Sequence, residues 1–268
     1  MDNKPLFSVV TVCYNASGLI RKTIESVLAQ DFADSEARFL CQNKPSGVEG
    51  LYNVGFEYII QDGNSSDDTL TIVEEYRAGF EEKGISLIVN SGKDKGIYDA
   101  MNKAVAAASG EYVIFMNADD CFYSGSVLSE VAESLYSSFS GIFSSDGSNN
   151  TCDTTSTVED NNNVTTENTA DYSRNLPGLI YGDCIVKELG MYFKFRKCYD
   201  LIKERMPFSH QACFARRELL IKHPLDLKYP ITADYDFLLK CHLNGYKFFD
   251  SDVTIALVTA DGVSSVKM

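Results

Sequence analysis

The chain has 268 residues, of which 44% are hydrophobic and 12% aromatic, enough to fill the core of one large domain or two small ones. Its 38 acidic and 24 basic residues give a net charge of −14, which argues against general binding to nucleic acid or to an anionic membrane. A small phosphate-bearing ligand stays compatible with this charge, because a metal ion and a few local cations are enough to hold it.

The eight cysteines are scattered along the chain, with no CxxC pair of the kind that marks zinc ribbons and thioredoxin-like sites. Several lie within apolar runs, where cysteine behaves as a small buried hydrophobic residue. No signal peptide precedes Phe7, and no apolar run approaches the length of a membrane span. We therefore expect a reduced, cytoplasmic protein with no transmembrane segment, and leave open a peripheral attachment at the inner face of the membrane.

Predicted strands and helices alternate along the first part of the chain. Strands are expected where β-branched and aromatic residues run together, and helices where apolar residues recur every three or four positions. This predicts strands at 6–14, 56–61, 86–90 and 112–116, and helices at 19–28, 70–76 and 96–109. Residues 33–53 show neither pattern and are expected to form an extended loop.

This alternation predicts an α/β fold with a doubly wound, mostly parallel central sheet flanked by helices in a single domain. Ligands of such sheets bind beyond the carboxyl ends of the strands. Polar clusters at Asn15, at Asp62 and at Asp119-Asp120 each follow a predicted strand directly. We expect them to converge at one edge of the sheet and to form a site there.

The segment from Tyr112 to Asp120 is the most informative in this part of the chain. An apolar run, YVIFM, stops abruptly at Asn117-Ala118-Asp119-Asp120, whose residue types favour a turn. Two adjacent carboxylates repel each other unless a cation lies between them, and hard oxygen ligands fit Mg²⁺ or Mn²⁺. The alternative is a solvated turn after a buried strand.

The second part of the chain contains a polar segment, residues 137–175, in which Ser, Thr, Asn and Asp dominate. Such a composition cannot bury enough apolar surface to order itself, so we predict a disordered insertion; the alternative is an excursion that orders over a ligand. Order is expected to resume with a strand at 179–183, helices at 218–223 and 235–243, and a last strand at 248–258.

Six segments follow one another along the chain: VVTVCYN, QDGNSSDDT, GKDKGIYDAMNKA, NADD, SHQACFARR and ITADYDFLLK. No single one is decisive, but their order and spacing cover nearly the whole chain apart from the insertion. Taken together and in this order, they resemble the family 2 glycosyltransferases, whose nucleotide-sugar-binding fold is called GT-A. The resemblance divides the domain into a nucleotide-sugar-binding half at 1–120 and an acceptor-binding half at 121–268.

The resemblance implies a metal site for Mn²⁺ or Mg²⁺ at the end of the fourth strand. Asp120 is then the more direct ligand, and Asp119 the partner of the metal, the ribose or the diphosphate. The family commonly has Asp-x-Asp here, whereas this chain has Asn117-Ala118-Asp119-Asp120, which leaves open how Asn117 shares these roles.

The resemblance also implies which residues bind the nucleotide and the sugar donor. Asp62 is expected near the nucleobase, with an Asx-turn or helix cap as the alternative. Tyr14 and Asn15 would line the nucleotide site, although Asn15 also suits a structural turn. The remaining donor contacts are expected from residues at the start of the predicted third helix, namely Lys95, Asp99 and Asn102.

Asp234 and Asp236 begin the predicted helix at the end of ITADYDF. In inverting members of the family an acidic residue near this position removes the proton of the acceptor hydroxyl. Alignment with the family favours Asp234 as this base, with Asp236 as the alternative; the two side chains face about 200° apart on a helix. His210 and Gln211 are candidates for contact with the acceptor or the diphosphate, and a structural role for His210 is equally open.

The sequence therefore predicts a metal-dependent, inverting glycosyltransferase of the hexosyltransferase class (EC 2.4). It would use a nucleoside-diphosphate sugar of the UDP, GDP or dTDP type. The acceptor would be a saccharide or lipid-linked saccharide in polysaccharide or glycolipid biosynthesis. The alternatives are a nucleotidyltransferase acting on sugar phosphates and a catalytically inactive module that binds nucleotide sugars.

Overall fold

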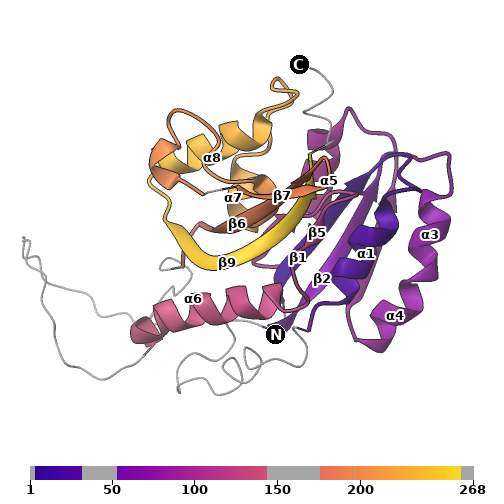
Figure 1. The fold of residues 1–268 in the computed structure, drawn as a ribbon, viewed down its shortest axis with the longest axis horizontal. Helices are drawn as coiled ribbons and strands as arrows, with labels where there is room; N and C mark the ends of the chain where they lie inside the picture. The colour runs from indigo at the N-terminus through magenta and orange to yellow at the C-terminus, as the bar shows by residue number, and fades with distance from the viewer. Residues whose placement is uncertain (1–3, 32–52, 144–175, 196, 261–268) are drawn as a thin grey trace, which may run out of the picture.

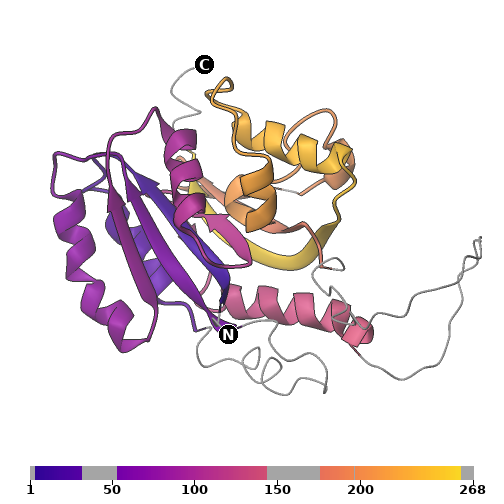
Figure 2. The same ribbon diagram turned by 180° about the vertical axis from the view of Figure 1, so that it is seen from behind.

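The computed structural model describes residues 4–31, 53–143, 176–195 and 197–260 (Figure 1). The expected loop at 33–53, except Asn53, and most of the expected insertion lie outside these residues. The described chain forms one mixed sheet of nine strands, with helices on both of its faces (Figures 1 and 2). This confirms the predicted α/β class with helices flanking a central sheet.

The strand order is β3-β2-β1-β4-β8-β6-β9-β5, with β7 paired to β6. The N-terminal strands β1 to β4 are all parallel to one another, as the strand–helix alternation predicts. In the C-terminal part, β8 pairs antiparallel with both β4 and β6, while β6 and β9 are parallel. The strands are β1 (Pro5–Cys13), β2 (Asn53–Asp62), β3 (Ser86–Ser91), β4 (Tyr112–Phe115), β5 (Cys121–Phe122), β6 (Leu179–Glu188), β7 (Met191–Phe195), β8 (Cys213–Arg216) and β9 (Phe248–Thr259).

Alternate residues of the central strands fill two separate cores. On β1, Phe7 and Val9 belong to one core, whereas Val10 and Val12 belong to the other. This alternation follows from the two-residue period of a strand, which sends successive side chains to opposite faces. Both faces of β1 are therefore buried, which explains its uninterrupted apolar sequence.

Different helices cover the two faces, as the opposite views in Figures 1 and 2 show. The first core is closed by α1 (Ile20–Leu28), α3 (Thr69–Glu75), α4 (Arg77–Glu82) and α6 (Val127–Phe143). The second is closed by α5 (Ile97–Ala107), α7 (Arg217–Lys222) and α8 (Ala233–Leu243). Two short 3-10 helices, η2 (Tyr199–Leu201) and η3 (His210–Ala212), lie in the C-terminal part. No helix within the described ranges has both the length and the apolar character needed to span a bilayer.

Three features differ from the sequence-based expectations. Helix α6 was not predicted; it runs to Phe143, so residues 137–143 are helical and the polar segment begins later than predicted. The expected second helix breaks at Tyr76 into α3 and α4. Strands β5, β7 and β8 were not predicted, because runs as short as Cys121–Phe122 carry no periodic signal and become strands only by pairing with distant segments.

Candidate active site

The loops that follow β1 and β2 are joined by hydrogen bonds. The Asn15 backbone N–H donates to the Ser65 hydroxyl at 2.8 Å, and the Ser66 N–H donates to the Asn15 side-chain oxygen at 2.9 Å. The Ser17 N–H donates to the Asp67 carboxylate at 3.0 Å. Asn15 has a φ of 47°, a conformation that asparagine tolerates better than most residues. Asn15 is therefore exposed at the sheet edge as expected, and its side chain braces the turn.

Asp62, which ends β2, is fully buried beneath this junction. Its carboxylate accepts hydrogen bonds from the backbone N–H groups of Asn64 and Ser65, each at 3.0 Å, and from the Ser91 hydroxyl at 2.6 Å. The Ser65 hydroxyl also donates to it. Asp62 was expected either to contact the nucleobase or to form an Asx-turn or helix cap. These contacts are those of an Asx-turn.

The residues expected to reach the donor from the start of α5 point in different directions. Asp99 accepts a hydrogen bond from the Lys95 backbone N–H at 3.0 Å and pairs with Lys103 at 2.9 Å. Asn102 exchanges two hydrogen bonds with the backbone of Leu225, at 2.9 and 3.0 Å, and so ties α5 to the loop after α7. Asp99 and Asn102 thus contact different segments, although they lie three residues apart on one helix.

Tyr14 and Lys95 are exposed at the rim of this edge. The Tyr14 ring, 65% exposed, lies against Gly63, where an added Cβ would be 3.3 Å from a ring carbon. An added Cβ at Gly63 would lie closer still to the Asp94 carboxylate, at 2.7 Å, so the glycine lets the loop after β3 approach the loop after β2. The Lys95 ammonium faces solvent, where it can offset negative charge of a ligand.

The carboxylate turn after β4 is held by α1. The Thr23 hydroxyl accepts from the Asp119 N–H at 3.0 Å and donates to the Asn117 carbonyl at 3.2 Å. Lys22 donates to the Asp119 carbonyl at 2.7 Å, and its ammonium lies 3.4 Å from the Asp119 carboxylate. Asp119 has a φ of 82°, so the backbone turns sharply at this residue. Neither Lys22 nor Thr23 was predicted, because nothing in their local sequence distinguishes them from other residues of an amphipathic helix.

Asp120, the next residue, points inward and is only 7% exposed. The Gln211 amide donates to its carboxylate at 3.0 Å. Burial raises the pKa of Asp120 to about 6, a shift to which the nearby charge of Asp119 adds and which the Gln211 hydrogen bond and His210 oppose. A buried carboxylate with an elevated pKa gains from a cation placed beside it.

Asn117 links the carboxylate turn to the C-terminal part of the chain. Its amide nitrogen donates to His210 Nε2 at 3.2 Å, while its side-chain oxygen is buried without a hydrogen-bond partner among the described residues. An unpaired buried oxygen is unfavourable unless a ligand completes it. Asn117 therefore offers an acceptor oxygen on the same turn that carries both carboxylates.

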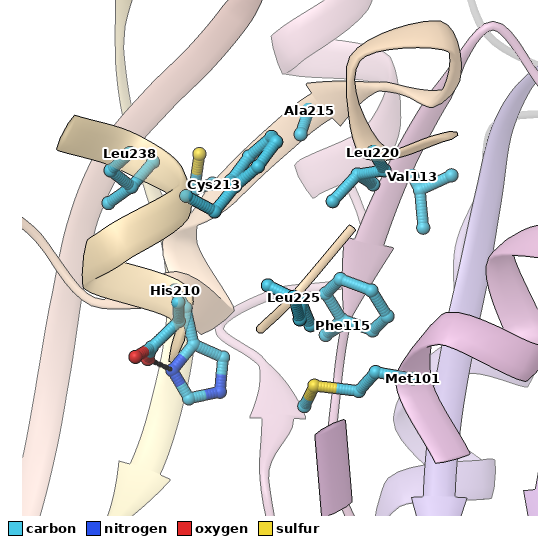
Figure 3. A pocket seen from close by; sticks show the side chains of 11 residues that line it. Met101, Val113, Phe115, His210, Cys213, Ala215, Leu220, Leu225 and Leu238 are labelled. Carbon is cyan, nitrogen blue, oxygen red and sulfur yellow. Dashed lines mark ion pairs between the residues drawn. The ribbon is translucent and has the colours of Figure 1, made fainter. Parts of the chain in front are cut away.

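His210 in turn contacts Asp234, its Nδ1 lying 2.9 Å from the carboxylate (Figure 3). Since Nε2 accepts from Asn117, the neutral ring is satisfied when Nδ1 carries the proton and donates it to Asp234. Tyr98 donates to the other Asp234 oxygen at 3.1 Å, and the Tyr235 N–H donates to that same oxygen at 2.9 Å. Burial by itself would raise the pKa of Asp234, but these contacts, led by His210, outweigh it and lower the pKa.

Asp236 faces another direction, as the helical spacing predicts. Its carboxylate pairs with Lys240 one turn along α8, at 2.6 Å. Of the two acids that begin α8, Asp234 is therefore the one in contact with His210. The contact between Tyr98 and Asp234 was not predicted, because the two residues lie 136 positions apart in the chain.

A small apolar cavity lies behind the His210–Asp234 pair (Figure 3). Its volume is about 30 Å³, room for a water molecule or two and far too small for a sugar. Side chains from α5, β4, β8 and α8 surround it, among them Met101, Phe115 and Leu238. A sugar therefore cannot occupy this cavity.

The residues of the carboxylate turn fit a divalent cation that is bound partly by the protein and partly by phosphate oxygens of a ligand. Within the described ranges no three His, Cys, Asp or Glu side chains form a complete metal site. Mg²⁺ and Mn²⁺ are commonly held by one or two carboxylates plus phosphate oxygens, so a complete protein cage is unnecessary. Asp120, Asp119 and the unpaired oxygen of Asn117 supply oxygen ligands from one turn.

Replacing the buried carboxylate gives a test in the metal-free protein. The folded state holds the Asp120 proton up to a pH of about 6, whereas the unfolded chain releases it near 3.8. Stability conferred by this group is therefore complete below pH 3.8 and is lost as the pH rises through 6. We expect Asp120→Asn to raise the unfolding free energy at pH 7.5 by about 2–3 kcal/mol and to have little effect at pH 4. Urea denaturation in EDTA at both pH values measures this; an equal effect at both would contradict it.

The sequence matches a known family over most of its length. The model of glycosyl transferase family 2 matches residues 8–223. A PGL/p-HBAD biosynthesis glycosyltransferase of Mycobacterium tuberculosis (strain ATCC 25177 / H37Ra) is 26% identical over 245 residues, which cover 90% of this chain and 71% of the relative.

Solved structures share the fold at lower sequence identity. Staphylococcus aureus TarS 1–349 in complex with UDP has a TM-score of 0.61 and 18% identity, over 95% of this chain and 60% of that one. Mannosyltransferase PcManGT from Pyrobaculum calidifontis, in complex with GDP-Man and Mn²⁺, has a TM-score of 0.54 and 15% identity, over 96% of this chain and 57% of that one. The chain thus spans about three fifths of each of these solved proteins.

Proposed function

This chain belongs to glycosyl transferase family 2 and has the GT-A fold, and from that premise we propose that it is a metal-dependent, inverting glycosyltransferase. It moves a sugar from a nucleoside-diphosphate sugar to an acceptor hydroxyl in the synthesis of a polysaccharide or glycolipid. Residues 1–120 carry most of the donor site and residues 121–268 the acceptor site. The proposal includes a lipid-linked acceptor and action at the inner face of a membrane.

One observation carries the proposal: the candidate base and the carboxylate turn are connected side chain to side chain. Asp234 contacts His210 at 2.9 Å, and His210 contacts Asn117 at 3.2 Å. Asn117 begins the turn that ends in Asp120, and Gln211, next to His210, contacts Asp120 at 3.0 Å. A sugar bound between them would meet a base on one side and a charge-stabilising group on the other, as an in-line displacement requires.

The reaction then proceeds in one displacement. The acceptor oxygen attacks the anomeric carbon while Asp234 takes the proton of that hydroxyl. The bond from the anomeric carbon to the diphosphate oxygen breaks, and the electron pair leaves with the nucleoside diphosphate. His210 and Tyr98 keep the Asp234 carboxylate oriented, and the low pKa keeps it ionised before the attack.

The leaving diphosphate is stabilised at the carboxylate turn. Asp120, with Asp119 and Asn117 beside it, would hold a divalent cation, which would supply Lewis-acid stabilisation of negative charge there. Tyr14, Asn15 and Lys95 support a nucleotide along the ends of β1 and β2. Asp62 supports it through the loop that it braces, and Asp99 through the Lys95 backbone.

Calorimetric titration with UDP, GDP and dTDP, each with and without Mn²⁺, tests the proposal. We expect one nucleotide to bind in the presence of Mn²⁺, and binding to weaken about 100-fold or more when EDTA removes the metal or Asp120→Ala removes its ligand. The matched control is Glu82→Ala, an exposed acid at the end of α4, which should bind as the wild type does.

Two outcomes would count against the proposal. If no nucleoside diphosphate binds to a protein shown to be folded by circular dichroism, an inactive module becomes the better description. If binding occurs but Asp120→Ala leaves its Mn²⁺ dependence unchanged, the metal lies elsewhere. The anomeric configuration of the product, read by NMR against that of the donor, checks the inverting course separately.

A further inference from the structure

A second hollow, separate from the carboxylate turn, lies between β7 and the loop that contains η2. Its volume is about 410 Å³, within the usual range of small-molecule pockets. Six of the residues that the structure describes line it, namely Lys194, Phe195, Cys198, Arg205, Met206 and Pro207. Nothing in the proposed chemistry so far uses any of them.

The wall of this hollow is a built structure. The Cys198 N–H donates to the Pro207 carbonyl at 2.8 Å, which closes the loop at its base. The Tyr235 hydroxyl donates to the Ile202 carbonyl at 2.9 Å, which fastens the loop to α8 one residue after Asp234. Beneath it, Tyr181 stacks between Tyr199 and Phe208, with ring centroids 6.2 and 4.5 Å away. The loop is therefore held in place by groups that do not depend on a ligand.

The lining combines cationic and apolar side chains. Arg205 makes no ion pair with any residue that the structure describes, and Lys194 pairs with Asp183 at 2.6 Å while remaining half exposed. Phe195, Met206 and Pro207 supply apolar surface between them. A free guanidinium beside an apolar wall suits a ligand in which an anionic group adjoins an apolar one.

A chain of neighbouring residues links the hollow to the candidate active site. Phe195 on β7 lies opposite Cys184 on β6. Burial raises the pKa of the Cys184 thiol to about 12, Ser209 beside it opposes the shift, and the charge of Asp120 adds to it. Ser209 donates to Gln211, which contacts Asp120, and Pro207 lies three residues before His210. The hollow thus adjoins the segment that carries His210 and Gln211.

The apolar surface continues outward along β7. All five residues of the strand are exposed, among them Met191, Tyr192 and Phe193 at 55%, 62% and 47%. Met191, Phe193 and Phe195 share one face of the strand, because successive side chains alternate between its faces, and such an exposed apolar row indicates a contact surface. The apolar part of a ligand anchored in the hollow would extend over this strand.

We propose that the hollow between β7 and the η2 loop binds the acceptor, and that this acceptor is an amphiphile with an anionic group next to its apolar part. This inference rests on the proposed transferase function and names the chemistry of its acceptor. Arg205 and Lys194 bind the anion, Phe195 and Met206 pack against the apolar part, and the reacting hydroxyl is directed toward Asp234. The anion can be the phosphate of a lipid carrier or a carboxylate; the recognition chemistry is the same.

Binding of simple amphiphiles tests this without a known substrate. The probes are octyl phosphate, octanoate, octyl glucoside and inorganic phosphate, each below its micellar concentration, titrated into the full chain and followed by NMR shifts. We expect an octyl anion to bind at one site, and octyl glucoside and inorganic phosphate each to bind at least about tenfold more weakly. The comparison of octyl phosphate with octanoate separates the two sources of the anion.

Variants locate the site. Arg205→Gln should weaken binding of the octyl anion about tenfold or more, since it removes a charge-assisted contact. Lys203→Gln, in the same loop but outside the lining, should leave it unchanged. Met206→Ala should weaken binding of the octyl anion and leave binding of inorganic phosphate unchanged. Equal binding to wild type and Arg205→Gln, or a preference for octyl glucoside, would overturn the proposal.

Nucleotide titration keeps this inference separate from the proposed function. Arg205→Gln should bind nucleoside diphosphate and Mn²⁺ as the wild type does. If the nucleotide binds but no octyl anion does, the acceptor inference fails and the transferase stands. If an octyl anion binds through Arg205 but no nucleotide does, the transferase proposal fails.

Discussion

Asp234→Asn is expected to lower kcat/KM by about 10²–10⁴-fold, the contribution of a positioned general base. Asparagine keeps the size of the side chain and can still accept from Tyr98 and the Tyr235 N–H, so the fold should survive. It cannot take the proton of an acceptor hydroxyl. Transfer from the donor that titration identifies, followed by release of its nucleoside diphosphate, measures the loss.

Asp236→Asn is the matched control, because it makes the same change two residues away on the same helix. Its carboxylate pairs with Lys240, and such a pair within one helix contributes a few tenths of a kcal/mol. We expect its kcat/KM to stay within about threefold of the wild type. If Asp236→Asn is inactive and Asp234→Asn is not, the base is Asp236.

The pH dependence of activity offers a second check on the same residue. Because the pKa of Asp234 is lowered, its ionised form is present at any pH above the ordinary range of a carboxyl group. The stability that its contacts provide is likewise present above the pKa of the unfolded chain and is lost as the pH falls through the lower, folded value. An activity lost near neutrality is therefore not attributable to Asp234.

Asp62→Ala is expected to lower the free energy of unfolding by about 3 kcal/mol. The change leaves the backbone N–H groups of Asn64 and Ser65 without their acceptor at a part-buried site, and the Ser91 hydroxyl without its partner. The loop after β2 should loosen, and nucleotide affinity should fall as a consequence. Urea denaturation and nucleotide titration of the same samples measure both effects.

Asp68→Ala provides the comparison, since this exposed acid in the same loop makes no side-chain cap hydrogen bond. It should change the unfolding free energy by less than about 0.5 kcal/mol. A loss of nucleotide binding in Asp62→Ala at unchanged stability would instead make Asp62 a direct ligand of the nucleobase, the other role that its position suggested.

Local sequence patterns predicted the frame of the molecule well. The strand–helix alternation through β4 depends on apolar periodicity, which is a property of neighbouring residues and needs no distant contact. The positions of Asn15, Asp62 and Asp120 at strand ends follow from the same patterns. The break at Tyr76 and the extension of α6 to Phe143 were missed, because helix ends depend on capping and packing more than on composition.

Side-chain directions were harder to predict than side-chain positions. Asp99 and Asn102 share a helix, yet one contacts Lys103 and the other the loop at Leu225. Asp62 was equally suited to a ligand or to a turn, and only the arrangement of Asn64, Ser65 and Ser91 around it gives the turn. The type of a residue limits the roles that it can take. Its neighbours in space decide which of these roles it has.

The sequence by itself determined that this is an α/β protein with acids at the carboxyl edge of a parallel sheet and a further acid at the start of a C-terminal helix. Tertiary structure alone decided that Asp234 reaches Asn117 through His210, and that Asp236 does not. The physical reason is that β8 inserts beside β4 and brings His210 next to a turn 93 positions away in the chain, a contact that no local pattern encodes.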